Sequence, residues 1–159
     1  MSAPPTRTPG CGVLASITGR PAAAGARHTR ELARAALVTE SRPGRYHQYD
    51  LIATYALEVA AEHESADERD EASGRVLDHF AQTLRRMNER HLNTTLPVIE
   101  DVPRPGVSSE IFDDVTAALD WFRANRDNLA AALRVALRRG QCPWRVPAAS
   151  FEACVADHV

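Results

Sequence analysis

The most informative segment of the sequence is PGRYHQYDLIATYALEVAAEH, residues 43–63. It begins with Pro43 and Gly44, which favour the backbone angles that a tight turn requires. The aromatic segment RYHQYD follows, and LIATYALEVAAEH then places apolar residues at helical spacing. This order predicts a β-hairpin whose second strand leads directly into an amphipathic helix.

Two residues at this junction invite a functional interpretation. Asp50 stands where the N-cap of the helix is expected, because its carboxylate can accept hydrogen bonds from the free N–H groups of the first turn. Tyr49 ends the strand, and we expect its ring to be buried, so that its loss would cost about 3–5 kcal/mol. The alternative for both is contact with a ligand. His47 lies two residues before Tyr49 on the same strand face and is a further candidate for ligand contact.

The segments before this junction are expected to be simpler. Residues 1–27 are rich in Pro, Gly and Ala, which is typical of a disordered tail. A short helix is expected from His28, and the segment ALVTES is then expected to form the first strand of the hairpin. Residues 28–64 make up the first predicted unit.

The segments after the junction are predicted to be helical. Residues 65–91 are predicted to form one long linking helix with an apolar face at helical spacing, made of Leu77, Phe80, Leu84, Met87 and His91. Residues 92–110 carry several prolines and form an extended connector. Residues 111–159 are expected to be an incomplete helical-repeat hairpin, with two antiparallel helices separated by a break near residues 125–127. The predicted fold class is therefore mainly α with one small β-hairpin.

Composition excludes several kinds of active site. All nineteen basic residues are arginines, so the chain has no lysine for a phosphate-binding loop, a Schiff base or a general base. The three cysteines, Cys11, Cys142 and Cys154, include no C-x-x-C pair, which argues against a disulfide framework and favours the reducing cytoplasm. No apolar run approaches the roughly 20 residues that a membrane-spanning helix needs.

Short motifs do not add a catalytic or metal site. His63-Glu64 begins like a zinc-protease motif, but position 67 is Asp, so the second histidine is missing. Cys154 and His158 have the spacing of two ligands on one helix face without a third nearby. The sequence therefore predicts no enzymatic activity, no bound metal and no cofactor.

Residues 43–62 resemble the end of the winged-helix subdomain of NB-ARC signal-transduction ATPases, as found in actinobacterial SARP-type transcriptional regulators. Gln48, Tyr49 and Asp50 take the place of the family's Met-His-Asp sensor element, and Tyr55-Ala56 matches positions of the following helix. The segment FDDVTAALDWFRANRDNLAAALRVALRRG is similar to the start of the family's tetratricopeptide-like repeats. The resemblance covers about residues 28–150.

This resemblance implies a regulatory role without catalysis. In the family, the sensor histidine reaches the ADP phosphate, whereas position 49 is Tyr here, and the nucleotide-binding core would precede residue 28. We therefore expect neither ATP hydrolysis nor tight ADP binding. The implied function is that of a regulatory fragment that acts through protein–protein contacts. Self-association through the C-terminal helices is also expected, because an incomplete repeat stack leaves Leu133, Leu137 and Val146 partly uncovered.

Two alternatives remain. Five arginines, which could contact phosphates in a DNA-binding winged helix, gather around the predicted first helix and the hairpin turn: Arg27, Arg30, Arg34, Arg42 and Arg45. The second alternative is an orphan truncated fragment without independent activity.

Overall fold

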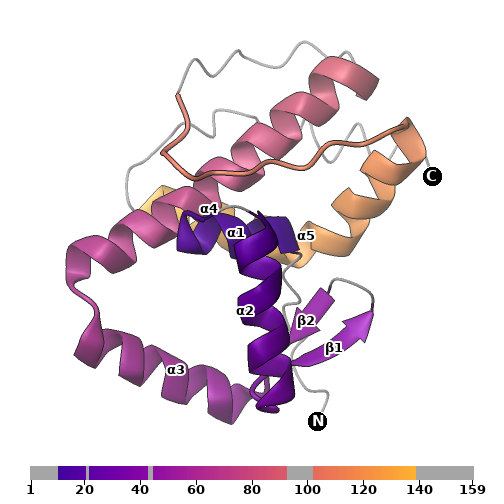
Figure 1. Cartoon of the computed structure of the whole chain (residues 1–159). Coiled ribbons are helices and arrows are strands. Elements are labelled where there is room, and N and C mark those ends of the chain that lie inside the picture. The colour runs from indigo at the N-terminus through magenta and orange to yellow at the C-terminus, as the bar shows by residue number, and fades with distance from the viewer. Residues whose placement is uncertain (1–10, 21, 43–44, 93–101, 139–159) are drawn as a thin grey trace, which may run out of the picture.

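The computed structural model describes residues 11–20, 22–42, 45–92 and 102–138 (Figure 1). In these ranges the chain forms five α-helices, one π-helical turn and one two-stranded antiparallel sheet. The predicted fold class, mainly α with one small β-hairpin, is confirmed. None of the helices in these ranges combines the length and the apolar character that a membrane crossing requires.

The chain is helical where a disordered tail was predicted. Helix α1 spans Cys11–Thr18 and helix α2 spans Ala22–Arg34. The prediction for residues 1–27 is therefore wrong for these segments, and residues 1–10 lie outside the described ranges. The small residues allow close packing. A Cβ atom on Gly25 of α2 would lie only 3.1 Å from the Cα atom of Ala15 in α1, so the two helices approach each other at a position where α2 has no side chain.

The β-hairpin follows α2 after a left-handed residue. Ala36 has a φ angle of 57°, and its N–H donates to the Ala33 carbonyl at 3.1 Å while the Leu37 N–H donates to the Leu32 carbonyl at 3.0 Å. This pair of hydrogen bonds is the Schellman arrangement that ends a helix. Strands β1, Thr39–Arg42, and β2, Arg45–His47, then pair antiparallel as predicted, and residues 43–44 between them lie outside the described ranges.

Two helices follow the hairpin. Helix α3 spans Asp50–His63, and helix α4 spans Ala66–Met87 and continues into a π-helical turn, Asn88–Leu92. The long helix predicted for residues 65–91 is confirmed. Ser65 and Glu68 form a capping box at its start: the Glu68 N–H donates to Ser65 Oγ, and the Ser65 N–H donates to the Glu68 carboxylate.

Helix α5 corrects the prediction for the C-terminal segment. It runs without a break over Val115–Arg138, so the two antiparallel helices expected on either side of residues 125–127 are one helix. The polar residues there do not interrupt it, because the Asn125 amide donates to the Trp121 carbonyl one turn earlier at 2.8 Å and is buried. The predicted hairpin partner in residues 139–159 lies outside the described ranges.

The core lies where α4, α5 and α1 meet. The apolar face predicted for α4 is buried, and it packs against small and branched side chains of α5 and against Val13 of α1. The buried members of this cluster are Val13, Leu77, Phe80, Leu84, Met87, Ala118, Leu129, Ala132 and Ala136. Trp121 packs beside it, with its ring 6.2 Å from that of Phe80. The His91 side chain, also predicted for this face, lies outside the description.

An extended segment, residues 102–114, crosses α4 between the π-helical turn and α5 (Figure 1). We call it the strap. Arg104 holds one end of it, because its guanidinium contacts both carboxylate oxygens of Asp78 at 3.0 Å and its backbone N–H donates to the same carboxylate. Further along, the Glu110 N–H donates to the Thr83 hydroxyl at 3.1 Å. The extended connector predicted for residues 92–110 is found at residues 102–110, whereas Leu92 still belongs to the π-helical turn.

Candidate functional site

The β2–α3 junction differs from its prediction. Tyr49, with φ −68° and ψ 145°, is the N-cap residue, and Asp50 is already the first helical residue. No side chain caps the helix through a hydrogen bond. The predicted N-cap role of Asp50 is therefore wrong, because the helix begins one residue earlier than expected and Tyr49 takes the N-cap position. Its charge still lies at the positive end of the helix.

The predicted burial of Tyr49 is also wrong. Its side chain is 57% exposed, because β2 ends at His47 and no described element covers the residues that follow. The expected proximity of Tyr49 and His47 is found: their rings meet edge to face, with centroids 5.2 Å apart. Tyr49 and Asp50 thus lie exposed at the entry to α3, and Gln48 before them is half-buried.

Helix α3 has an unusual exposed face. None of its residues is buried, whereas Leu51, Tyr55 and Leu57 are 79%, 62% and 73% exposed. Leu51 and Tyr55 are four residues apart and therefore share one face, which Glu58 and Glu62 continue along the helix. The side opposite this face is only half-buried, at Ala53 and Ala60. Figure 1 shows that α3 extends away from the α4–α5 core.

Negative charge gathers around this face. Residues 50–71 contain eight acidic residues and one arginine, whereas the net charge of the whole chain is −2. All eight carboxylates are exposed: Asp50, Glu58, Glu62, Glu64, Asp67, Glu68, Asp70 and Glu71. The Arg69 guanidinium donates its hydrogen bonds to the backbone carbonyl groups of Ala60 and Glu64. We call the exposed residues Leu51, Tyr55, Glu58 and Glu62 the α3 face.

Among the arginines proposed for phosphate contact, the four whose side chains are described do not share one setting. Arg27, Arg30 and Arg34 are exposed on α2, where the Arg30 guanidinium donates to the Ala26 carbonyl at 3.2 Å. Arg45 is half-buried, and its guanidinium donates to the Ala124 carbonyl of α5 at 3.1 Å. The side chain of Arg42 lies outside the description. The structure therefore groups the α2 arginines and turns Arg45 toward α5.

A buried polar cluster that the sequence did not reveal joins α1, α4 and the strap. Ser16 Oγ lies 3.2 Å from His79 Nδ1 and accepts a hydrogen bond from the Ser108 N–H at 3.1 Å. His79 Nδ1 also contacts the Ser108 carbonyl, which places the proton of a neutral imidazole on Nδ1. Because these residues lie 63 and 92 positions apart in sequence, no local motif could have indicated the cluster.

This cluster has the residue types of a nucleophile and a base but is closed. The side chains of Ser16 and His79 are both 0% exposed, so a substrate has no route to the hydroxyl in this conformation. Burial lowers the pKa of His79 below its ordinary value, and the Ser108 carbonyl opposes that effect only in part. Burial raises the pKa of the nearby Glu110, whereas Arg45 lowers it. The arrangement keeps His79 neutral and fixes the strap.

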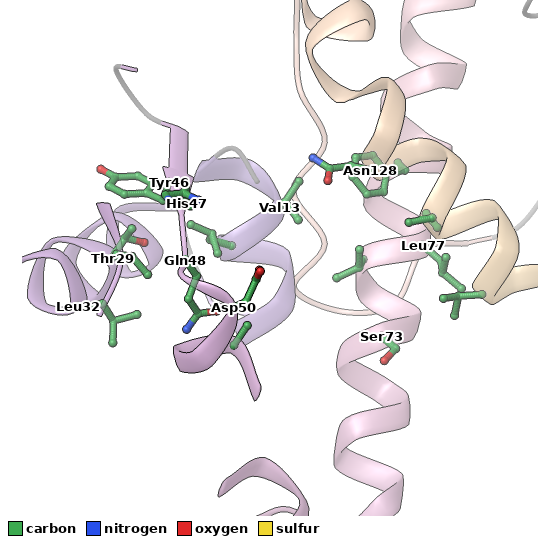
Figure 2. A pocket seen from close by; sticks show the side chains of 18 residues that line it. Val13, Thr29, Leu32, Tyr46, His47, Gln48, Asp50, Ser73, Leu77 and Asn128 are labelled. Atoms are coloured by element: carbon green, nitrogen blue, oxygen red, sulfur yellow. The ribbon is translucent and has the colours of Figure 1, made fainter. Parts of the chain in front are cut away.

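A half-open cavity of about 740 Å³ lies between two walls (Figure 2). One wall comes from α2, β2 and the start of α3, and the other comes from α4 and α5. Most of its lining is apolar, including Val13, Val76 and Val135. At the β2–α3 junction the lining becomes polar, with His47, Gln48 and Asp50, so the predicted sensor element reaches the cavity in two of its three residues.

The described residues contain no group of three or more His, Cys, Asp and Glu side chains that could hold a metal ion. His63 is exposed at the end of α3, and Cys154 and His158 lie outside the described ranges. Comparison with protein-family models, with curated proteins and with solved structures gives no match for this chain.

Proposed function

We propose that this chain is a non-catalytic regulatory module that acts through protein–protein contacts, with the α3 face as its docking surface. The observation that carries the proposal is a helix without a buried residue whose Leu51 and Tyr55 are more than half exposed. Large apolar side chains exposed side by side are typical of interaction surfaces. The resemblance of residues 43–62 to a winged-helix end of transcription-regulating signalling proteins supports a regulatory role.

The charge around the α3 face defines the chemistry of its partner. Leu51 and Tyr55 would anchor an apolar stripe, and Glu58 and Glu62 would face positive charge beside it. An amphipathic helix with leucines at helical spacing and arginines or lysines on its flanks has both features. The partner we propose is therefore a basic amphipathic helix of another protein.

A designed peptide pair tests this proposal. One peptide is a basic amphipathic helix with leucines at helical spacing, and its matched counterpart carries glutamate in place of every arginine. Fluorescence anisotropy with the full chain should show binding of the basic peptide only. The double variant Leu51→Ser/Tyr55→Ser should weaken it by about tenfold or more, since exposed anchors of this kind dominate interface energies.

Leu57→Ser supplies the control. Leu57 is as exposed as Leu51 but lies on another side of α3, so its variant should bind the basic peptide like the original chain. Equal loss in both variants, or equal binding of the two peptides, would refute the α3 face as a docking surface.

DNA binding is the alternative that the α2 arginines favour, because Arg27, Arg30 and Arg34 are all exposed. Duplex DNA in place of the peptide separates the two. Salt-sensitive duplex binding that is lost in the triple variant Arg27→Ala/Arg30→Ala/Arg34→Ala would replace the protein-contact proposal.

Self-association is a second protein contact to measure. Leu137, at the end of α5, is 61% exposed, while Leu133 is half-buried against the core. Light scattering of the original chain and of Leu137→Ser measures that contribution.

A further inference from the structure

The cavity between the two walls has hydrogen-bonding groups that the protein does not use. The buried Nδ1 atom of His47 has no hydrogen-bond partner among the described residues. Within the same described ranges, the amide of Gln48 and the carboxylate of Asp50 have no hydrogen-bond or ion-pair partner either. The buried His47 nitrogen is costly to leave unpartnered unless something binds it, whereas the half-buried Gln48 amide and the exposed Asp50 carboxylate stand beside it with free hydrogen-bonding capacity.

These groups all come from one short segment and face an apolar space. His47 ends β2, Gln48 follows it, and Asp50 begins α3. Figure 2 shows Gln48 and Asp50 on one wall, while Ser73, Leu77 and Asn128 lie on the opposite wall. Ser73 is already committed, because its hydroxyl donates to the Arg69 carbonyl at 2.8 Å. The polar groups that remain available to a ligand therefore lie at the β2–α3 end of the cavity.

The volume suits a small molecule. At about 740 Å³ the cavity lies within the range of about 300–1,000 Å³ that is typical of ligand pockets. Such pockets combine mostly apolar walls with a few polar groups that fix the orientation of the ligand. Val13, Val76 and Val135 supply such walls here.

The polar groups select the charge of the ligand. Asp50 is the one charged side chain among the described residues that line the cavity, and it is an acceptor. The Gln48 carbonyl oxygen and an unprotonated His47 Nδ1 are acceptors as well. A protonated primary amine offers three hydrogen-bond donors, and its positive charge can pair with the Asp50 carboxylate.

We propose that this cavity binds an apolar primary amine, with the ammonium group at His47, Gln48 and Asp50 and the apolar body between α4, α5 and α1. This site is separate from the α3 face, because Asp50 and Ala53 line the cavity whereas Leu51 and Tyr55 do not.

Three probes of matched size test the proposal: 4-phenylbutylamine, 4-phenylbutanol and 4-phenylbutyrate. Calorimetric titration of the full chain should give the tightest binding for the amine, with the alcohol about tenfold weaker and the carboxylate weaker still, since a charge-assisted hydrogen bond is about twice as strong as a neutral one. Tighter binding of the carboxylate, or no heat with any probe at millimolar concentration, would overturn the proposal.

Two variants locate the site. Asp50→Asn should bring the affinity for the amine down to that for the alcohol, whereas Glu62→Gln, the same charge change further along α3, should leave the amine affinity unchanged. Ala131→Phe places a ring in the cavity from α5 and should abolish binding of the amine. Circular dichroism shows whether each variant is folded. Retained amine preference in a folded Asp50→Asn variant would contradict the assignment. Binding of the basic peptide to Ala131→Phe measures the α3 face separately.

Discussion

Ser16 Oγ in α1 lies 3.2 Å from His79 Nδ1 in α4, although 63 residues separate the two in sequence. The strap completes this contact, because the Ser108 N–H donates to the same hydroxyl at 3.1 Å. Three segments that are distant along the chain therefore depend on one neutral imidazole. This dependence makes the protein sensitive to acid.

The first prediction concerns that sensitivity. Burial lowers the pKa of His79 below 6.5, so below pH 6.5 the unfolded chain takes up a proton that the folded chain does not. Above pH 6.5 His79 is neutral in both states and does not reduce the free energy of unfolding. As the pH falls from 6.5 toward the pKa of His79 in the folded protein, the free energy of unfolding decreases. For one proton the slope is at most about 1.4 kcal/mol per pH unit. Urea unfolding at a series of pH values measures it.

Matched variants isolate the contribution of His79. His79→Gln should lower stability at neutral pH and flatten the profile just below pH 6.5, while His63→Gln, at an exposed position, should keep the original slope. Glu110 acts with the opposite sign, since its raised pKa makes ionisation unfavourable as the pH rises above 4.5. A slope that persists in His79→Gln would assign the acid sensitivity to another group.

The second prediction concerns the ion pair that holds the strap. Arg104 contacts both oxygens of the Asp78 carboxylate, and the side chains are 35% and 18% exposed. Because hydrogen bonds to charged groups are worth about 1.5–3 kcal/mol, Arg104→Ala should lower the free energy of unfolding by that amount. Arg123→Ala, which removes the exposed pair with Asp120, should cost only about 0.3–0.5 kcal/mol. Equal losses in the two variants would mean that the strap is not held through Arg104.

The third prediction is a gain in stability. Ala36 occupies a left-handed conformation, with φ at 57°, in the position where glycine is preferred after a helix. Ala36→Gly should raise the free energy of unfolding by about 1 kcal/mol, because the left-handed conformation is strained for alanine. Ala33→Gly, inside α2, should lower it by about 1 kcal/mol. Thermal melts of both variants distinguish relief of strain from a general effect of glycine.

The fourth prediction revises the expectation for the β2–α3 junction. With Tyr49 57% exposed, Tyr49→Ala should cost well under the loss of about 3–5 kcal/mol that a buried ring would give. Asp50→Ala removes only a favourable charge at the start of α3, so about 0.3–1 kcal/mol is expected. Ser65→Ala, at the true capping box of α4, should cost about 1 kcal/mol. A large loss of stability in Tyr49→Ala would show that another surface covers its ring.

The sequence predicted the elements that local patterns determine. The hairpin follows from Pro43-Gly44 between two short strands, and α4 follows from apolar residues at helical spacing. It did not predict α1, because composition alone cannot distinguish an Ala- and Gly-rich tail from helices that pack closely through Gly25. It also placed a break at Asn125, because a polar side chain that satisfies itself on the preceding turn looks the same in sequence as one that ends a helix.

The functional residues divide in the same way. The sequence singled out Asp50 from its place at a strand–helix junction, His47 from strand alternation, and Gln48 through the family resemblance; all three line the cavity. It assigned burial to Tyr49 from strand alternation, which fails because β2 ends two residues earlier. The contact of Ser16, His79 and the strap is set by tertiary packing alone, so no spacing of residues records it.

The unbroken course of α5 has a mechanical consequence. A helix of 24 residues is about 36 Å long. The hairpin is tied to its middle, where the Arg45 guanidinium donates to the Ala124 carbonyl, and its flanks at Ala118 and Ala136 are buried in the core. The hairpin therefore lies against a part of α5 that is held in the core on both sides and has no break at which it could bend.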